Sequence, residues 1–181
     1  MRGKIFLGTL ALAAVLLAGC GGGSTEKQPE QSTASASQGE AVQFEGTDLE
    51  GNLVTSDLFS QSKLTMVNVW ATYCNPCLNE MPDLGELAAA YALEDVQIIG
   101  IVSDVLEGED QELAESLVEE TQANYPHLLL NESIFYGLLT DVAAVPTTFF
   151  IDGEGVVLDT VVGARDKSAW EEMIHGFLEA D

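Results

Sequence analysis

The chain has 181 residues, of which 46% are hydrophobic, and its formal net charge is −24. The length fits one domain with additional segments, and the hydrophobic content is sufficient for a packed core. Such an excess of carboxylates argues against binding to nucleic acid and against electrostatic adhesion to anionic lipid. Three cysteines are too few for the disulfide framework of a small secreted domain, so the pair and the single cysteine need separate explanations.

The first twenty residues have the pattern of a lipoprotein signal. Arg2 and Lys4 form a basic start, and an apolar run follows at 5–18. This run is short for a spanning helix, which needs about 20 residues, but it suits a signal peptide. It ends in Leu-Ala-Gly-Cys, which resembles the lipobox of bacterial lipoproteins. We therefore expect residues 1–19 to be a signal peptide and Cys20 to be lipidated, with an ordinary signal peptide as the alternative.

The next segment has the composition of a tether. Residues 21–39 are rich in Gly, Ser, Thr and Gln and contain no aromatic or large aliphatic side chain. Such a segment cannot bury enough apolar surface to order itself. We expect residues 20–40 to be a flexible tether with a mean reach of about 25 Å. It would hold a domain at 41–181 close to the extracytoplasmic face of the cell membrane.

Apolar runs and turn residues predict the elements of this domain in chain order. A hairpin is expected at 42–54, strands at 64–70, 96–103, 127–130, 146–151 and 156–162, and helices at 78–93, 110–123, 134–140 and 168–178. Pro82 should kink the first helix, and Ser168 with Glu171 should form a capping box at the start of the last. The mixture of crossovers and hairpins implies an α/β fold with a central mixed sheet and helices on both faces.

Two cysteines that follow a predicted buried strand are the candidate reactive residues. Cys74 and Cys77 have two residues between them, follow the strand at 64–70 and precede a helix. This arrangement places Cys74 at a helix N-terminus, where amide groups and the helix dipole stabilise a thiolate. The thiolate is the nucleophile of disulfide exchange, although the same motif taken alone is also typical of zinc sites.

Further motifs make the chain similar to the thioredoxin superfamily, and more narrowly to the membrane-tethered thiol–disulfide oxidoreductases of the TlpA/ResA type. The similarity covers residues 41–181 and rests on Val67 to Cys77, Glu80-Met81-Pro82, Val145 to Phe149 and an extra segment between Asp104 and Thr140. It implies a thioredoxin-like fold with a central mixed sheet, an N-terminal hairpin and a central insertion. It also implies a redox disulfide between Cys74 and Cys77, and no cofactor.

The resemblance assigns roles to single residues around this pair. Cys74 should be the exposed attacking thiolate, and Cys77 should resolve the mixed disulfide. Pro146 should be a cis proline that brings the Val145 backbone beside Cys74, where it can pair with an extended substrate segment. The alternative is an ordinary trans proline at the start of an edge strand.

Four more residues near the cysteines are expected to contact substrate. Asn75 and Pro76 lie between the cysteines and tune the reduction potential, and Pro76 suits the first turn of a helix. Trp70 and Tyr73 should flank Cys74 as apolar contact surface. Either aromatic residue could instead fill the core, and this alternative is stronger for Trp70.

A carboxylate near the motif is a candidate for proton handling. Asn68 occupies the position where cytoplasmic thioredoxins have a buried aspartate, and an amide cannot act as a base. Glu80 follows Cys77 by about one helical turn, so we hypothesise that it manages the proton of Cys77 with a pKa raised by partial burial. The alternative is a solvated carboxylate that the helix dipole favours.

Metal binding has little support in the sequence. A zinc site would need two ligands beyond the cysteines. The two histidines, His127 and His175, look like ordinary surface or packing residues, and the seven carboxylates between Glu107 and Glu120 lack the pattern of a calcium loop. We therefore expect no metal.

The combined prediction is a lipid-anchored, extracytoplasmic thiol–disulfide oxidoreductase that acts as a monomer. Its partners would be exported protein thiols and disulfides, such as apocytochrome c, with an integral membrane thiol reductase as electron donor. A peroxiredoxin-like peroxidase is a weaker alternative, because Val67 and Ala71 occupy positions where that motif needs Pro and Thr. A copper-handling module of the Sco type is another, although its cysteines have three residues between them and a partnering histidine.

Overall fold

The computed structural model describes residues 39–180. The predicted signal peptide, the lipidated Cys20 and all but the last residues of the tether lie outside this part of the chain. Within residues 39–180, no helix is both long enough and apolar enough to cross a membrane.

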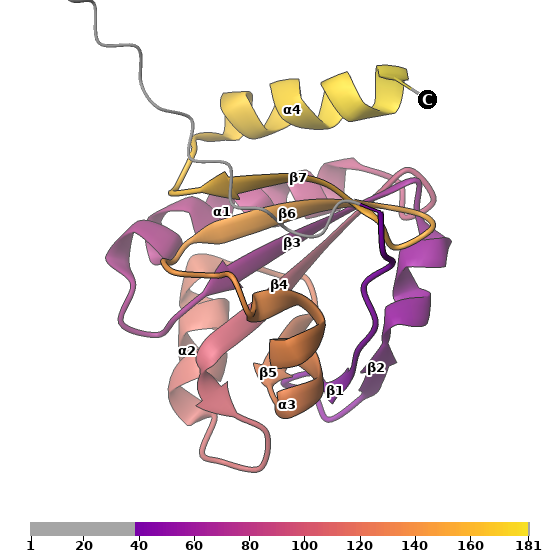
Figure 1. Ribbon diagram of the computed structural model, residues 1–181. Coiled ribbons are helices and arrows are strands. Elements are labelled where there is room, and N and C mark those ends of the chain that lie inside the picture. Colours follow the sequence, from indigo (N-terminus) through magenta and orange to yellow (C-terminus); the bar gives the residue numbers. More distant parts are fainter. Residues whose placement is uncertain (1–38, 181) are drawn as a thin grey trace, which may run out of the picture. The chain divides into compact units, whose positions relative to one another are not determined.

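A five-stranded mixed sheet forms the centre of the domain (Figure 1). Its strand order is β5-β4-β3-β6-β7, with β3 parallel to β4, β4 parallel to β5, and β6 antiparallel to both β3 and β7. The strands are β3 (Leu64–Trp70), β4 (Val96–Leu106), β5 (His127–Leu130), β6 (Thr147–Asp152) and β7 (Val157–Val162). All seven residues of β3 are buried, because this central strand is covered on both faces.

Helices cover the two faces of the sheet, as Figure 1 shows with α3 in front and α1 behind. One face packs against α1 (Asn75–Ala90), α2 (Glu112–Thr121) and α4 (Lys167–Ala180). The other face packs against η1 (Ser56–Gln61), α3 (Glu132–Ile134) and the π-helical turn η2 (Phe135–Leu139). The alternation along β3 explains the division, since Met66 and Trp70 belong to the first cluster and Val67 and Val69 to the second.

A small antiparallel sheet precedes η1. It consists of β1 (Glu45–Thr47) and β2 (Leu53–Thr55), and the Asp48 carboxylate closes the turn by accepting hydrogen bonds from the amides of Glu50 and Asn52. Asp48 also bridges to Leu128 of β5, which attaches the hairpin to the main sheet. The predicted mixed sheet, its flanking helices and the N-terminal hairpin are thus confirmed.

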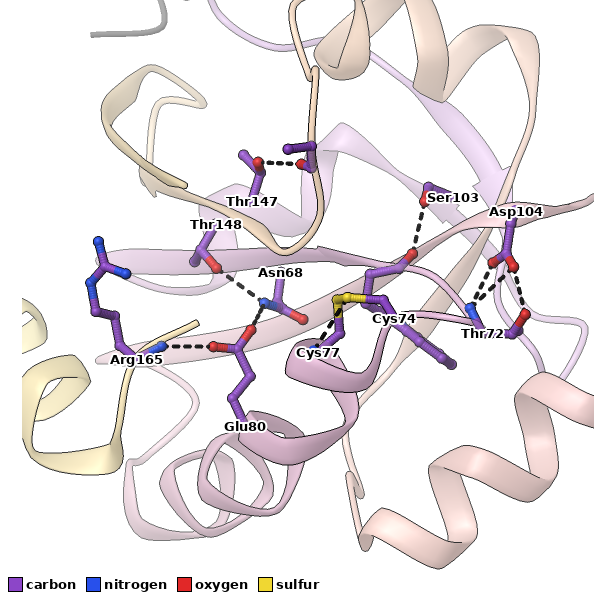
Figure 2. Close-up of a disulfide and its surroundings, with 12 residues drawn as sticks. Asn68, Thr72, Cys74, Cys77, Glu80, Ser103, Asp104, Thr147, Thr148 and Arg165 are labelled. Carbon is purple, nitrogen blue, oxygen red and sulfur yellow. Dashed lines mark hydrogen bonds between the residues drawn. A yellow bond between two sulfur atoms is a disulfide. The ribbon is translucent and has the colours of Figure 1, made fainter. Parts of the chain in front are cut away.

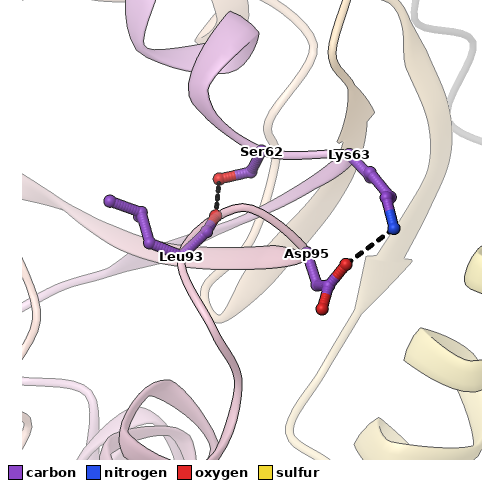
Figure 3. Close-up of polar contacts among 4 residues, drawn as sticks. All are labelled: Ser62, Lys63, Leu93 and Asp95. Atoms are coloured by element: carbon purple, nitrogen blue, oxygen red, sulfur yellow. Dashed lines mark hydrogen bonds and ion pairs between the residues drawn. The ribbon is translucent and has the colours of Figure 1, made fainter.

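Short polar contacts join the starts of β3 and β4 (Figure 3). The Ser62 hydroxyl donates to the carbonyl of Leu93 at 2.5 Å, and the Lys63 ammonium lies 2.7 Å from the Asp95 carboxylate. The ion pair is largely exposed, so its contribution to stability is below about 1 kcal/mol. These contacts bring the chain segments before the two parallel strands together at the end of the sheet away from the cysteines.

Some boundaries differ from those predicted. α1 begins at Asn75 and not at 78, because Cys74 already caps it, and it continues through Pro82 to Ala90. The capping box predicted for Ser168 and Glu171 is wrong. The Asp166 carboxylate instead accepts from the amide of Ala169 at 2.9 Å, so the cap lies two residues earlier than predicted.

Candidate active site

The two cysteines form a disulfide at the start of α1 (Figure 2). Cys74 is the N-cap of the helix, and its sulfur accepts a hydrogen bond from the amide of Cys77 at 3.3 Å. Pro76 lies in the first turn, where its missing N–H needs no partner. The predicted position of Cys74 at a helix N-terminus is confirmed, and the free amides there stabilise a Cys74 thiolate once the disulfide opens.

The two sulfur-bearing residues differ in their contact with solvent. Cys74 is 6% exposed in this disulfide form, less than the sequence led us to expect, and Cys77 is completely buried. Tyr73 is 74% exposed, and Asn75 and Pro76 are also exposed, so the surface around Cys74 is open to a partner. A partner thiol therefore reacts with Cys74 first, and Cys77 takes part in the second, intramolecular step.

Trp70 does not belong to this surface. It is fully buried on β3, and its indole N–H donates to Nδ1 of His127 at 3.1 Å. The predicted substrate contact is therefore wrong for Trp70, and the core alternative holds. The side chain faces the side of the sheet that α1, α2 and α4 cover, because it shares the alternation of Met66.

The loop between β3 and Cys74 is held by the end of β4. The Asp104 carboxylate accepts from the Thr72 amide at 2.9 Å and from the Thr72 hydroxyl at 2.5 Å. The Ser103 hydroxyl donates to the carbonyl of Trp70 at 2.9 Å. These contacts fix the approach of the chain to Cys74, and sequence reasoning did not identify them because Asp104 lies far along the chain from the motif.

The Val145–Pro146 peptide bond is cis, as predicted. Val69 pairs with Thr147 across β3 and β6, so Pro146 lies beside the end of the strand that leads to Cys74. The Pro146 carbonyl accepts from the amide of Gly163 at 2.8 Å, which attaches the loop after β7 to the same edge. Val145 packs against the core cluster that contains both cysteines.

Glu80 lies one turn after Cys77 and is only 2% exposed. Its two carboxylate oxygens have separate partners: Oε1 accepts from Nδ2 of Asn68 at 2.9 Å, and Oε2 accepts from the amide of Arg165 at 3.1 Å (Figure 2). The solvated alternative for this carboxylate is thereby excluded. Its role in proton transfer stays a prediction.

The surroundings of Glu80 shift its protonation. Burial raises the pKa of Glu80 above its usual 4.5, and the hydrogen bonds from Arg165 and Asn68 oppose this effect in part. Burial likewise raises the pKa of Tyr125, and the charge of Glu80 adds to that rise. Glu80 lies one turn from Cys77, and a carboxyl with a raised pKa is suited to exchange a proton with a thiol.

Potential metal ligands are dispersed in the described part of the chain. Among residues 39–180, no group of three or more His, Cys, Asp or Glu side chains is arranged to hold a metal ion. His127 packs against Trp70 and Tyr125 inside the core, and His175 lies exposed on α4.

Comparison with known proteins shows the family to which this chain belongs. Residues 38–160 match the AhpC/TSA family. The thiol–disulfide oxidoreductase ResA of Bacillus cereus is 31% identical over 141 residues, which cover 77% of this chain and 75% of the relative. The chain belongs to the AhpC/TSA family and is a thiol–disulfide oxidoreductase of the ResA and DsbE type.

Two further relatives agree with this assignment. The thiol:disulfide interchange protein DsbE of Escherichia coli is 30% identical over 136 residues, which cover 75% of this chain and 69% of the relative. The crystal structure of a putative DsbE from Chlorobium tepidum superposes with a TM-score of 0.65 at 25% identity, over 80% of this chain and 99% of that one. The enzyme class and the thioredoxin-like fold predicted from the sequence are confirmed.

Proposed function

We propose that this oxidoreductase works outside the cytoplasm, anchored by lipid on Cys20, as a reductant of disulfides in exported proteins. The observation that carries the proposal is the asymmetric pair: Cys74 caps α1, is 6% exposed and has exposed neighbours on both sides, while Cys77 is completely buried one turn from Glu80. The lipobox-like sequence at 17–20 and the tether support the location. The resemblance to TlpA/ResA-type proteins supports the direction.

The reaction starts with the Cys74 thiolate attacking a substrate disulfide. One substrate sulfur forms a mixed disulfide with Cys74, and the other leaves as a thiolate and takes up a proton. Cys77 then transfers its proton to Glu80, and the Cys77 thiolate attacks the Cys74 sulfur. As the second substrate sulfur leaves Cys74, Glu80 gives it the proton taken from Cys77. The substrate thus leaves as a dithiol that has gained two electrons and two protons, and the Cys74–Cys77 disulfide remains.

The cycle closes when a dithiol reduces this disulfide again. An integral membrane thiol reductase would supply the two electrons, and a flexible tether with a mean reach of about 25 Å would keep the domain close to it. Tyr73, Asn75, Pro76 and the Val145 backbone would contact the substrate segment. Apocytochrome c is a candidate substrate, since members of the resembled subgroup reduce it, and the domain would act as a monomer.

The reduction potential of the Cys74–Cys77 pair tests the direction. A value near about −270 mV or below is expected for a reductant, whereas a value near about −120 mV would identify an oxidant and refute the proposal. A separate experiment tests the anchor. Labelled palmitate should be incorporated into the wild-type chain and not into Cys20→Ser, and equal labelling of both would refute lipidation at Cys20.

A thiol peroxidase is the second candidate, favoured by the match to the AhpC/TSA family. Val67 and Ala71 argue against it, because they occupy positions where a peroxidatic site needs Pro and Thr. Consumption of a reduced dithiol partner should depend on a disulfide substrate and not on hydrogen peroxide. Peroxide-dependent turnover that is lost in Cys74→Ser would favour the peroxidase.

A further inference from the structure

One buried polar atom on β3 has no hydrogen-bond partner among the described residues. Asn68 is fully buried on β3, and its amide nitrogen donates to Oε1 of Glu80 at 2.9 Å and to the Thr148 hydroxyl at 3.0 Å. Both N–H groups of the amide are therefore used. Its oxygen, Oδ1, has no partner among the described residues.

The two donated hydrogen bonds determine which way the amide points. Because Glu80 can only accept in its ionised form, the nitrogen of Asn68 must face it, and the oxygen is turned the other way. Figure 2 shows this oxygen on the side of the amide that faces the Cys74–Cys77 pair. A buried acceptor without a donor is unfavourable, so a donor that arises nearby would relieve that cost.

Reduction of the disulfide creates such a donor. When a partner dithiol reduces the pair, the S–S bond breaks, two electrons and two protons enter, and the partner becomes a disulfide. In the product, Cys74 is held at the helix N-terminus, where amide groups stabilise its thiolate, while Cys77 is completely buried, which disfavours a thiolate there. The Cys77 sulfur consequently retains its proton as an S–H group.

We propose that Asn68 is a positioning residue whose Oδ1 accepts a hydrogen bond from the Cys77 thiol in the dithiol form. Asn68 thereby keeps Cys77 neutral and oriented until Cys74 has formed the mixed disulfide. The proton then leaves toward Glu80, which the same amide holds through its nitrogen. The proposal rests on the exchange activity of the pair and is independent of its direction and location.

The expected signature has a defined sign. A hydrogen bond from the Cys77 thiol to Oδ1 of Asn68 favours the thiol over the thiolate and the dithiol over the disulfide. Asn68→Ala should therefore lower the pKa of Cys77 by about half a unit to one unit. It should also shift the equilibrium with glutathione about fivefold toward the disulfide, which equals about −20 mV.

The charge of Glu80 must be separated from this effect, because loss of Asn68 also removes a donor to Glu80. The substitution is therefore compared in a Glu80→Gln background, where the Gln side chain can still accept from Asn68. Cys74 is the other titrating thiol, and Arg165 and Tyr125 are ionisable side chains that interact electrostatically with Glu80; all three are the same in these variants. Every protein carries Cys20→Ser, so that only the two active-site thiols titrate.

The pKa of each thiol is measured from the pH dependence of the ¹³Cβ shifts in the full chain with labelled cysteine. A lower Cys77 pKa for Asn68→Ala in both backgrounds supports the proposal. An unchanged pKa overturns it, and a higher one overturns it by showing that the amide nitrogen and not the oxygen faces the sulfur. Thr148→Val is the matched control, since it removes the other partner of Asn68 and should leave the Cys77 pKa unchanged.

A second measurement does not depend on the stability of Asn68→Ala. In Cys74→Ser, Cys77 is the remaining active-site thiol, and its S–H stretching band should lie below that of a free thiol in an apolar solvent. A band at the free-thiol position would overturn the proposal. Failure of the pair to exchange with any dithiol would instead count against the function itself.

Discussion

His127 and Glu80 are both buried on the face of the sheet that α1, α2 and α4 cover, and they are held in different ways. His127 accepts from the Trp70 indole at one ring nitrogen and contacts the carbonyl of Ala123 at the other, 3.0 Å away. Both ring nitrogens therefore have hydrogen-bond partners that stay the same when the disulfide opens or closes. Glu80 is linked through Asn68 to an amide oxygen without a partner among the described residues and lies one turn from a disulfide that opens and closes.

The difference shows that burial alone does not make a functional group. Burial lowers the pKa of His127 to about 4 and raises the pKa of Glu80, so in both cases it makes the charged form less favourable than it is in water. Only Glu80 has surroundings whose hydrogen-bonding capacity changes during a redox cycle. We therefore expect substitutions at His127 to affect stability, and substitutions around Glu80 to affect chemistry.

The largest effect on the active-site side should come from the cysteines. Cys74→Ser should reduce disulfide exchange to the background rate, because a hydroxyl does not replace the thiolate nucleophile. Cys77→Ser should retain attack by Cys74 but accumulate the mixed disulfide, which non-reducing electrophoresis detects. Accumulation in Cys74→Ser and not in Cys77→Ser would reverse the assigned roles.

His127→Ala should have the largest effect on stability, with a loss of about 3 kcal/mol. The substitution leaves a cavity and removes the acceptor of the buried Trp70 indole. Urea unfolding measures the loss, and His175→Ala is the control, since His175 is exposed and should change stability by less than about 0.5 kcal/mol. If activity of the folded protein fell more than stability explains, the contrast between the two sites would fail.

The pH dependence of stability should distinguish the two groups by sign. The pKa of His127 in the folded protein lies below its ordinary 6.5. Between about pH 4 and pH 6.5, the unfolded chain therefore binds more protons at this residue than the folded protein does. His127 therefore contributes about 3 kcal/mol above pH 6.5, and this contribution is lost as the pH falls toward about 4. Chemical denaturation of wild type across this range should show a rise with pH that is absent in His127→Ala.

Glu80→Gln should show the opposite dependence and a change in chemistry. Because the folded pKa of Glu80 is raised, its contribution is present below its ordinary 4.5 and is lost as the pH rises through the folded value. Removing this carboxyl should flatten that fall in stability and slow resolution of the mixed disulfide about tenfold or more. The pH profile of thiol alkylation checks the second effect, and an unchanged profile would remove Glu80 from the mechanism.

The smallest effect should come from Asp104→Ala. Loss of its contacts to Thr72 should loosen the loop before Cys74, lower kcat/KM a few-fold and cost about 1 kcal/mol of stability. Asp104→Asn keeps an acceptor for the amide and should have the weaker effect in steady-state kinetics. Equal effects of both substitutions would show that the charge of Asp104 matters and not its position.

Much of the fold and the reactive pair could be predicted because the signals are local. The continuous apolar run of β3, the two cysteines after it and the proline before β6 lie within short segments. Their spacing specifies a buried strand, a helix start and a turn with few alternatives. Local patterns were less reliable at helix ends, where Asp166 and not Ser168 provides the cap of α4.

The neighbours of the buried groups could not be predicted because they come from distant positions. Gly100 is one example: a Cβ atom there would lie 2.1 Å from Nδ1 of His127, so only glycine leaves room for the ring that holds Trp70. Nothing in the sequence around either residue indicates the contact. The same is true of Arg165, which meets Glu80 from 85 residues away through its backbone amide.

The sequence by itself determined the chemistry of this protein, since two cysteines between a buried strand and a helix, together with the Val145 to Phe149 motif, are typical of thiol–disulfide exchange. Only the tertiary structure decided which polar groups share the interior with them. Packing α1 and α4 against β3 removed Glu80 and Asn68 from water, and burial is what gives a carboxyl an altered pKa and an unpaired amide oxygen an energetic cost.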